Sequence, residues 1–326
     1  MGEPAGVGPE LIIKVKKILK NAYPFYVVGD FKFLTSIAKT NSIRTLRITH
    51  PNQTYENPDK LCIWDQKLPD KVVPGQISYK NSSVIKKNIK DAAILVLKNQ
   101  ASALITSPIN KWALKKASDF PFEGHTDYLA SLDPGNPMSI MMLTNRQNFR
   151  VVPVTIHLPL KQVSSRLNSK LLEETIIILN KSLRKDYQIK NPSIVITGLN
   201  PHAGEQSTMG YEEIDIIIPV IKKMNKLGFN LTGPLSADTS FTKDKRLKYD
   251  AFVCMYHDQA LIPVKTLSFD ESINVTLGLS FIRTSPDHGT ALDIAGKNIA
   301  NPKSLILAIK EAQKIANVRR KNDEKK

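Results

Sequence analysis

The chain contains very few cysteines and no long apolar run. Cys62 and Cys254 are the only cysteines among its 326 residues, and they form no C-x-x-C pair. We therefore expect two packed core thiols in a reducing compartment. No run approaches the roughly 18 apolar residues that a membrane helix needs. The start MGEPAGVGPE has neither the charged nor the apolar region of a signal peptide, so the sequence predicts a cytoplasmic protein with no membrane partner.

Acidic residues are scarce relative to basic ones, and aromatic residues are few. The chain has 46 Lys and Arg against 30 Asp and Glu, a net charge of +16, and 7% aromatic residues. Such a charge suits anionic partners, either phosphorylated small molecules or nucleic acid. The lysines are spread over helix-like stretches and a basic tail, with few aromatics beside them, which does not indicate a stacking platform for nucleic acid. We expect a phosphorylated small molecule as partner and no nucleic acid.

Helix-like and strand-like patterns alternate along the chain. This alternation predicts an α/β fold with a mostly parallel sheet, and the length allows two domains. The segment 40–80 carries four prolines and is expected to be irregular or built from edge strands. DFPFEGH breaks the pattern near 120–125 and indicates a boundary. Expected strands are 25–30, 102–108, 193–200 and 249–258, and expected helices are 9–20, 160–184, 211–227 and 302–318.

Three histidines each follow a strand-like run. They are His157 in TIHLPL, His202 in GLNPHAGE and His257 in FVCMYHDQ. Taken singly, each is more typical of a hydrogen-bonded loop residue. Ligands of open α/β sheets gather outside the carboxyl ends of strands, where all three would fall. Three imidazoles with one open position are a catalytic metal arrangement, so together they favour a metal centre.

The glycine-rich start GEPAGVGPE is a second candidate site. Its glycines permit close backbone approach, and the helix that follows attracts anions at its first turn, although a plain tight turn fits the local pattern nearly as well. Such a segment normally follows a strand, and only Met1 precedes it here. We therefore expect either that the start codon is misplaced or that the first strand is missing from this sequence.

Further polar residues stand in apolar or helix-starting surroundings. His125 and Thr126 could hold a phosphate or carboxylate at a helix start, unless Thr126 or Asp127 simply caps that helix. Asp238 could be a turn residue, a carboxylate beside a metal or an acid/base group. Charges in apolar regions need partners, which an anionic substrate or internal salt bridges could supply. This applies to Lys265 and Arg283, and the uncharged polar side chain of Asn274 stands in the same apolar region.

One long stretch resembles a known superfamily. DHGTALDIAGKNIANP, residues 287–302, is similar to the adenine- and ribose-binding loop of the isocitrate and isopropylmalate dehydrogenases, with His288, Gly289 and Asp293 in the matching places. The resemblance implies NAD or NADP as cofactor, and Asp293 favours NAD because a carboxylate would repel a 2′-phosphate. It also implies two α/β/α domains around a central cleft. We expect a cofactor-side domain of 1–120 with 285–326, and a metal- and substrate-binding, dimer-forming domain of 121–284.

Seven longer motifs narrow the resemblance to the 4-hydroxythreonine-4-phosphate dehydrogenase family of pyridoxal 5′-phosphate biosynthesis. The resemblance implies one divalent metal (zinc, magnesium or cobalt) on His157, His202 and His257. It also implies a homodimer with the active site at the subunit interface and one metal ligand from the partner chain. Substrate contacts would fall on His125, Thr126, Lys265, Asn274 and Arg283. The motifs are TIHLPL, GLNPHAGE, MGYEEID, GPLSADTSF, MYHDQALIPVK, NVTLGLSFIRTS and GHTDYLA.

The family reaction is an oxidative decarboxylation. It oxidises the secondary hydroxyl of 4-phosphooxy-L-threonine, and the resulting β-keto acid loses carbon dioxide to give 3-amino-2-oxopropyl phosphate. Lys265 and a metal-bound hydroxide are the first candidates for the general base, and Asp238 is the next candidate. A second interpretation keeps the chemistry and changes the substrate to a four-carbon sugar-acid phosphate, D-erythronate or D-threonate 4-phosphate.

Overall fold

The computed structural model describes residues 1–117 and 120–324, and the chain divides into two compact units. Unit 1 contains Met1–Pro137 and Leu279–Ala316, and unit 2 contains Met138–Gly278 and Asn317–Lys326. The domain division expected from the sequence, 1–120 with 285–326 and 121–284, stays a prediction. His125 and Thr126 belong to unit 1, as does the glycine-rich start.

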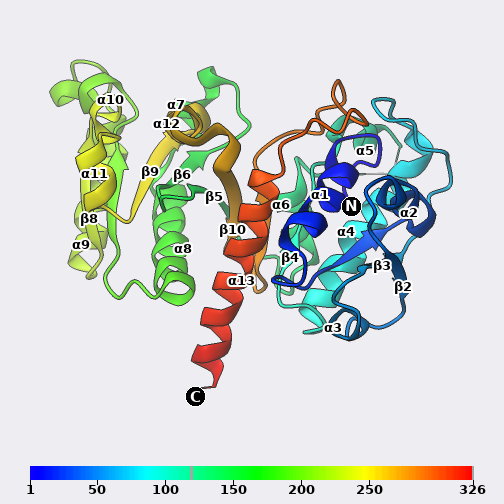
Figure 1. Cartoon of the computed structure of the whole chain (residues 1–326). Helices are drawn as coiled ribbons and strands as arrows, with labels where there is room; N and C mark the ends of the chain where they lie inside the picture. Colours follow the sequence, from blue (N-terminus) through cyan, green and yellow to red (C-terminus); the bar gives the residue numbers. More distant parts are fainter. Residues whose placement is uncertain (118–119, 325–326) are drawn as a thin grey trace. The chain divides into compact units, whose positions relative to one another are not determined.

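Unit 1 contains a three-stranded parallel sheet with β3 in the middle (Figure 1). The expectation of irregular structure or edge strands for 40–80 was wrong for β3, because its apolar residues LCI are buried between two neighbours. The apolar side of α1 packs on this sheet, and Asp30 caps α2 by accepting the Phe33 N–H. The elements are α1 (Gly8–Leu19), β1 (Tyr26–Gly29), α2 (Phe31–Thr40), β2 (Thr45–Ile48), α3 (Gln53–Glu56) and β3 (Leu61–Asp65).

A second part of unit 1 is built around a short parallel strand pair. β4 pairs with β11, so the strand expected at 102–108 is only two residues long in the structure. Three helices pack beside this pair around a shared core that includes Ile85, Leu114 and Leu129. The elements are η1 (Tyr79–Asn81), α4 (Ser82–Leu97), β4 (Leu104–Ile105), α5 (Lys111–Ala117), α6 (His125–Leu132) and β11 (Arg283–Pro286).

Unit 2 is built on six strands in the order β10-β5-β6-β9-β7-β8. The pairs of β6 with β9, β9 with β7, and β7 with β8 are parallel, whereas β5 is antiparallel to both of its neighbours. Parallel pairs predominate over the two units, which confirms the predicted α/β class. The strands are β5 (Ile140–Asn145), β6 (Arg150–Thr155), β7 (Ser193–Thr197), β8 (Asn230–Leu235), β9 (Ala251–Tyr256) and β10 (Ser272–Leu277).

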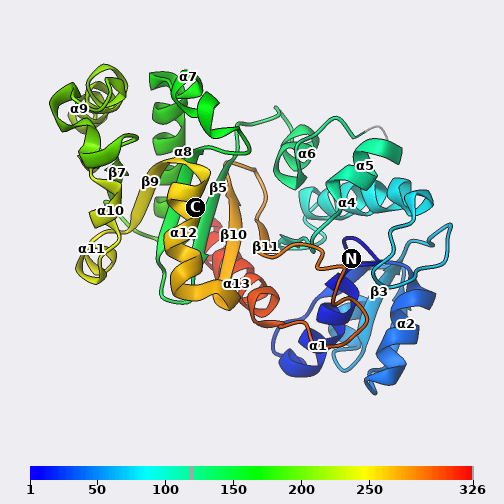
Figure 2. The same ribbon diagram turned by 90° about the horizontal axis from the view of Figure 1, so that it is seen from above.

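Helices cover both faces of the unit 2 sheet. Every residue of β5 and β6 is buried, and both α8 and α12 pack on these strands. On one face of the sheet, Val151 of β6 and Phe252 of β9 share a hydrophobic cluster with Ala260 and Val264 of α12. This helix lies across the strands in Figure 2. The intervening side chains point to the opposite face. The remaining elements are η2 (Leu160–Gln162), α7 (Val163–Arg166), α8 (Ser169–Tyr187), η3 (Pro201–Ser207), the π-helical turn η4 (Glu213–Ile217), α9 (Ile218–Lys226), α10 (Ala237–Ser240), α11 (Lys243–Lys248), α12 (His257–Ser268) and η5 (Phe269–Glu271).

The last helix, α13 (Lys303–Asp323), extends beyond the predicted end at residue 318. Within unit 2, Arg319 donates from Nε and Nη2 to the two oxygens of Asp186, at 2.7 and 2.9 Å. The Asp186 side chain is 5% exposed and that of Arg319 is 19% exposed. This bidentate ion pair connects the final turns of α13 to Asp186 of α8, a contact that the sequence pattern did not predict.

Both cysteines lie in the core. Cys62 and Cys254 are buried and form no disulfide with each other, as predicted.

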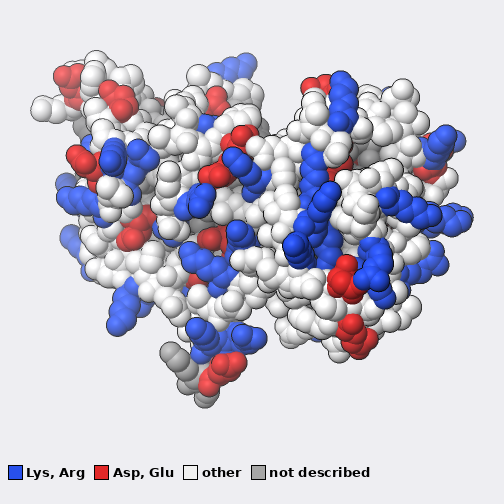
Figure 3. Space-filling view, in the orientation of Figure 1, with Lys and Arg blue, Asp and Glu red and all other residues white. Residues whose placement is uncertain are grey.

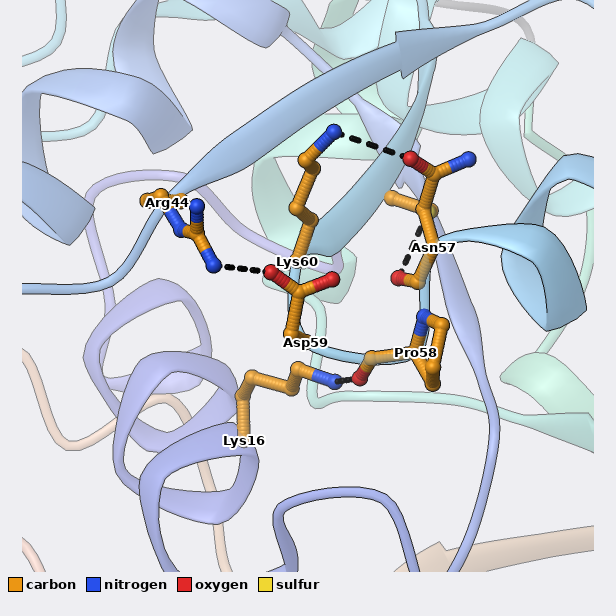
Figure 4. Close-up of polar contacts among 7 residues, drawn as sticks. Lys16, Arg44, Asn57, Pro58, Asp59 and Lys60 are labelled. Atoms are coloured by element: carbon orange, nitrogen blue, oxygen red, sulfur yellow. Dashed lines mark hydrogen bonds and ion pairs between the residues drawn. The ribbon is translucent and has the colours of Figure 1, made fainter.

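Some basic side chains have partners close by in the structure. Lys16 Nζ donates to the Pro58 carbonyl at 2.5 Å, and Arg44 forms an ion pair with Asp59 (Figure 4). On the face drawn in Figure 3, basic side chains are interspersed with acidic and uncharged ones. Within the described residues, no helix has the length and apolar character needed to cross a membrane.

Candidate active site

His157 and His257 lie side by side in unit 2. β6 and β9 are parallel neighbours with Thr155 opposite Tyr256, so the residues that follow the two strands emerge at the same edge of the sheet. The two imidazole rings have centroids 6.0 Å apart. His257 begins α12, and its Nδ1 lies 2.7 Å from Asp258 Oδ1. A carboxylate on one ring nitrogen orients the other nitrogen of an imidazole, as is common for metal-binding histidines.

His202 follows β7, the other neighbour of β9, and lies in an unusual turn. Residues 202–206 have φ values between 38° and 79°, so five consecutive residues are left-handed. Holding a non-glycine residue there costs on the order of 1–2 kcal/mol. Such strain persists only where the surroundings fix it, and it clusters at functional sites. Within the described part of one chain, no group of three His, Cys, Asp or Glu side chains is arranged to hold a metal ion.

Asp238 lies on α10, which packs against the turn that carries His202. Its Oδ1 accepts a hydrogen bond from Ser236 Oγ at 2.6 Å. This bond, together with the Thr239 N–H and the nearby His202, holds the pKa of Asp238 below its usual value. A carboxylate with a lowered pKa is a weak general base near neutral pH. The geometry therefore suits a charge partner for His202 better than a proton acceptor.

Lys265 and Asn274 are the other two unit 2 candidates. Lys265 lies on α12 and lines the same surface hollow as His257, together with Leu261 and Phe269. Asn274 belongs to β10, opposite Leu143 of β5. Its buried Oδ1 has no hydrogen-bond partner in the part of the chain that the structure describes. A buried carbonyl oxygen without a partner is costly, which is typical of a group that awaits a ligand.

In unit 1, His125 begins α6 and is influenced by the charge of Arg283. Gly124 precedes α6, and no side chain caps that helix, so the capping interpretation of Thr126 or Asp127 was wrong. Nε2 of His125 is buried and, among the described residues, lacks a partner. Burial first, and then the charges of Arg283, the amino terminus and Lys111, lower the pKa of His125 well below its usual value.

Arg283 is buried in β11 and remains a cation. It is 4% exposed, and its Nη2 donates to Thr106 Oγ1 at 2.7 Å. Burial lowers the pKa of Arg283 to about 10, which still leaves the guanidinium charged at neutral pH. A buried guanidinium beside a neutral imidazole suits an anionic group, such as a phosphate or carboxylate.

The predicted cofactor loop contacts the glycine-rich start. The Val7 N–H donates to the Thr290 carbonyl at 2.9 Å, and a Cβ on Gly6 would lie 2.7 Å from the same oxygen. Within the loop, His288 Nδ1 lies 2.8 Å from the Gly289 carbonyl, and Asp293 is exposed. The sequence indicated both segments but not their contact, which is made by close backbone approach at glycine.

Comparison with known proteins confirms the resemblance that the motifs indicated. The family model described as pyridoxal phosphate biosynthetic protein PdxA matches residues 20–312. A 4-hydroxythreonine-4-phosphate dehydrogenase of Ruegeria sp. is 43% identical over 98% of this chain and 96% of its own length. The enzyme of that name from Roseobacter denitrificans is 46% identical over 97% and 95%.

Solved structures agree with this assignment. The crystal structure of 4-hydroxythreonine-4-phosphate dehydrogenase from Klebsiella pneumoniae has a TM-score of 0.85 at 36% identity, covering 97% of this chain and 98% of the other. A terephthalate 1,2-cis-dihydrodiol dehydrogenase from Burkholderia xenovorans has a TM-score of 0.64 at 26% identity, with 96% of each chain covered. The chain therefore belongs to the PdxA family of pyridoxal phosphate biosynthetic proteins.

Proposed function

We propose that this protein is a 4-hydroxythreonine-4-phosphate dehydrogenase, which oxidises 4-phosphooxy-L-threonine with NAD or NADP and releases carbon dioxide and 3-amino-2-oxopropyl phosphate. The observation that carries the proposal is the convergence of His157 and His257 at the carboxyl ends of β6 and β9. It is supported by the name shared by relatives that match nearly the whole chain. The sugar-acid phosphate alternative is not favoured by these relatives.

The histidines fit a divalent cation, with zinc, magnesium or cobalt as the candidates. Imidazole nitrogens bind zinc at about 2.1 Å, so two rings with centroids 6.0 Å apart can share one ion. Because one chain does not gather three ligands among its described residues, we propose a homodimer in which the three histidines are drawn from two copies. A cation held by these histidines would act as a Lewis acid toward the substrate hydroxyl that is oxidised.

The other candidate residues orient the substrate and move its proton. An anionic group of the substrate would be held by Arg283, His125 and Thr126. Asn274 would form a hydrogen bond, as donor or acceptor, with a second polar group of the substrate. Lys265 shares a surface hollow with His257 and is our candidate for the group that accepts the hydroxyl proton. Asp238 is the weaker candidate because its pKa is lowered.

The cofactor would lie on the loop that contains His288, Gly289 and Asp293. A nicotinamide cofactor bound there would supply the hydride acceptor, and the residues of the loop would align it with the substrate. An exposed carboxylate at Asp293 supports NAD over NADP. Two buried free thiols support a reducing compartment, which agrees with a cytoplasmic enzyme.

A turnover assay tests this proposal. Purified protein is mixed with 4-phosphooxy-L-threonine, NAD and each candidate metal, and NADH formation is followed together with carbon dioxide release. We expect activity that a chelator abolishes and added metal restores. His202→Ala should be inactive while its circular dichroism spectrum is unchanged, whereas His50→Ala, an exposed histidine of unit 1, should be fully active. Full activity after chelation, or in His202→Ala, would contradict the proposal.

A further inference from the structure

A buried carboxylate lies beneath the turn that carries His202. Glu213, the first residue of η4, is 1% exposed. Its Oε1 accepts the N–H groups of Leu199 and Asn200 at 2.7 and 2.8 Å, and its Oε2 accepts Asn200 Nδ2 at 2.9 Å. Three N–H donors satisfy the charge of a carboxylate that water does not reach. Glu213 therefore fixes the chain just before His202.

The same carboxylate contacts the turn on both sides of His202. A Cβ added to Gly204 would lie 2.6 Å from Glu213 Oε2, and one added to Gly198 would lie 2.9 Å from Oε1. At Gly204 the carboxylate alone occupies the space of a side chain, whereas at Gly198 a Cβ would also lie 2.7 Å from Ala203 Cα. The backbone from 198 to 204 thus winds closely around one acidic group.

Asn200 connects Glu213 to the left-handed residues of the turn through hydrogen bonds. While its N–H and side-chain amide donate to Glu213, its carbonyl accepts the Ala203 N–H at 3.1 Å. His202 lies between these two anchored residues and has a φ of 53°. A non-glycine residue leaves the left-handed region unless its surroundings hold it there. Removing the carboxylate would release the main-chain N–H groups of Leu199 and Asn200 that anchor this turn.

We propose that Glu213 is a positioning residue that sets the direction of the His202 imidazole and thereby the metal affinity of the site. This inference rests on the proposed function, because it takes His202 to be a metal ligand. Glu213 acts through the backbone of 199–204 and does not itself bind the metal. Partners that orient a ligand commonly change metal affinity by about 10- to 100-fold when they are removed.

The neighbouring Glu212 provides a matched control. Its Oε2 also accepts Asn200 Nδ2, at 2.7 Å, and its Oε1 accepts the Ser164 hydroxyl. Unlike Glu213, it is partly exposed, and of Asn200 it contacts the side chain but not the main chain. Loss of Glu212 leaves the two main-chain bonds to Leu199 and Asn200 in place.

The first experiment measures zinc affinity by competition with a chromogenic chelator, in the full-length protein. We expect Glu213→Ala to raise the Kd about 10- to 100-fold. Glu213→Gln should restore most of the affinity, because its amide oxygen can still accept both main-chain N–H groups. Glu212→Gln should stay within about twofold of the wild type. Cobalt-loaded Glu213→Ala should also show altered visible absorption bands, which a general loss of stability would not produce.

A glycine pair tests the contact from the other side and covers the case in which Glu213→Ala does not fold. Gly204→Ala pushes a methyl group into the Glu213 carboxylate, and we expect the same loss of zinc affinity. Gly228→Ala is the control, because Gly228 also has a positive φ (89°) but a Cβ there would meet nothing within 4 Å. It should keep wild-type affinity.

His202→Ala separates the two proposals. If His202→Ala binds zinc as tightly as the wild type, the proposed metal site fails and the inference fails with it. If His202→Ala loses zinc while both Glu213→Ala and Gly204→Ala keep wild-type affinity and cobalt spectra, the inference alone is overturned. Loss of affinity in Gly204→Ala with retention in Gly228→Ala supports it, as does rescue by Glu213→Gln.

Discussion

His157 and His257 have ring centroids 6.0 Å apart because β6 and β9 are parallel neighbours in register. The two residues are distant in the sequence, and each stands just past the end of its strand. In an α/β sheet, the carboxyl ends of adjacent parallel strands form the edge at which ligands bind. The pairing of these two strands therefore brings together two of the three histidines of the proposed metal site.

Removing either histidine should weaken metal binding strongly. We expect His157→Ala and His257→Ala each to raise the zinc Kd at least about 100-fold, because a ligand is lost and not merely reoriented. Equilibrium dialysis of the purified variants measures the change. His50→Ala is the control and should bind as the wild type does. Unchanged affinity in both variants would show that the pair is structural.

Mixing inactive variants should restore part of the activity. If the three histidines of one site come from two copies, a dimer of His202→Ala with His157→Ala or His257→Ala regains one intact site for at least one of the two pairings. Random mixing makes half of the dimers mixed, so up to about a quarter of wild-type activity is expected. The assay follows NADH formation after subunit exchange. No recovery in any pairing would place all three ligands in one chain.

The Arg319–Asp186 pair should be a strong stabilising contact of unit 2. Arg319→Met leaves a nearly buried carboxylate without its partner, and we expect the free energy of unfolding to fall by about 2–4 kcal/mol. Lys170→Met breaks an exposed pair with Glu174 and should cost less than about 0.5 kcal/mol. Urea unfolding measures both. Equal, small effects would show that the Arg319 pair is no stronger than a surface contact.

His125 should make stability depend on pH below its ordinary pKa. Its pKa is 6.5 when unperturbed and well below that in the folded chain, chiefly because of burial and then Arg283. Below pH 6.5 the unfolded chain therefore binds a proton that the folded chain refuses, and stability falls as the pH falls. Above that pH the contribution is constant.

The comparison with His125→Gln isolates this effect. Between about pH 7.5 and about pH 5, the wild type should lose up to about 2 kcal/mol more than His125→Gln, at 1.36 kcal/mol per pH unit. Urea unfolding at the two pH values measures the difference. Parallel losses in the two proteins would mean that His125 has no lowered pKa.

The sequence predicted the strands before the three histidines, because apolar runs that end in polar residues are a strong local signal. It did not predict β3 as a central strand, because prolines surround a strand whose apolar run, LCIW, is only four residues long, and because its central place depends on pairing with β1 and β2. It also gave Glu213 no role within MGYEEID. The bonds from Glu213 to Leu199 and Asn200 depend on tertiary contact, and no local pattern distinguishes it from the partly exposed Glu212.

The central claim is tested most directly by comparing substrates with the metal-loaded wild-type protein. kcat/KM is measured with NAD for 4-phosphooxy-L-threonine, D-erythronate 4-phosphate and D-threonate 4-phosphate, side by side. The account predicts the highest value for 4-phosphooxy-L-threonine, with one carbon dioxide released for each NADH formed. A higher value for either sugar-acid phosphate, or no turnover of 4-phosphooxy-L-threonine, would contradict it.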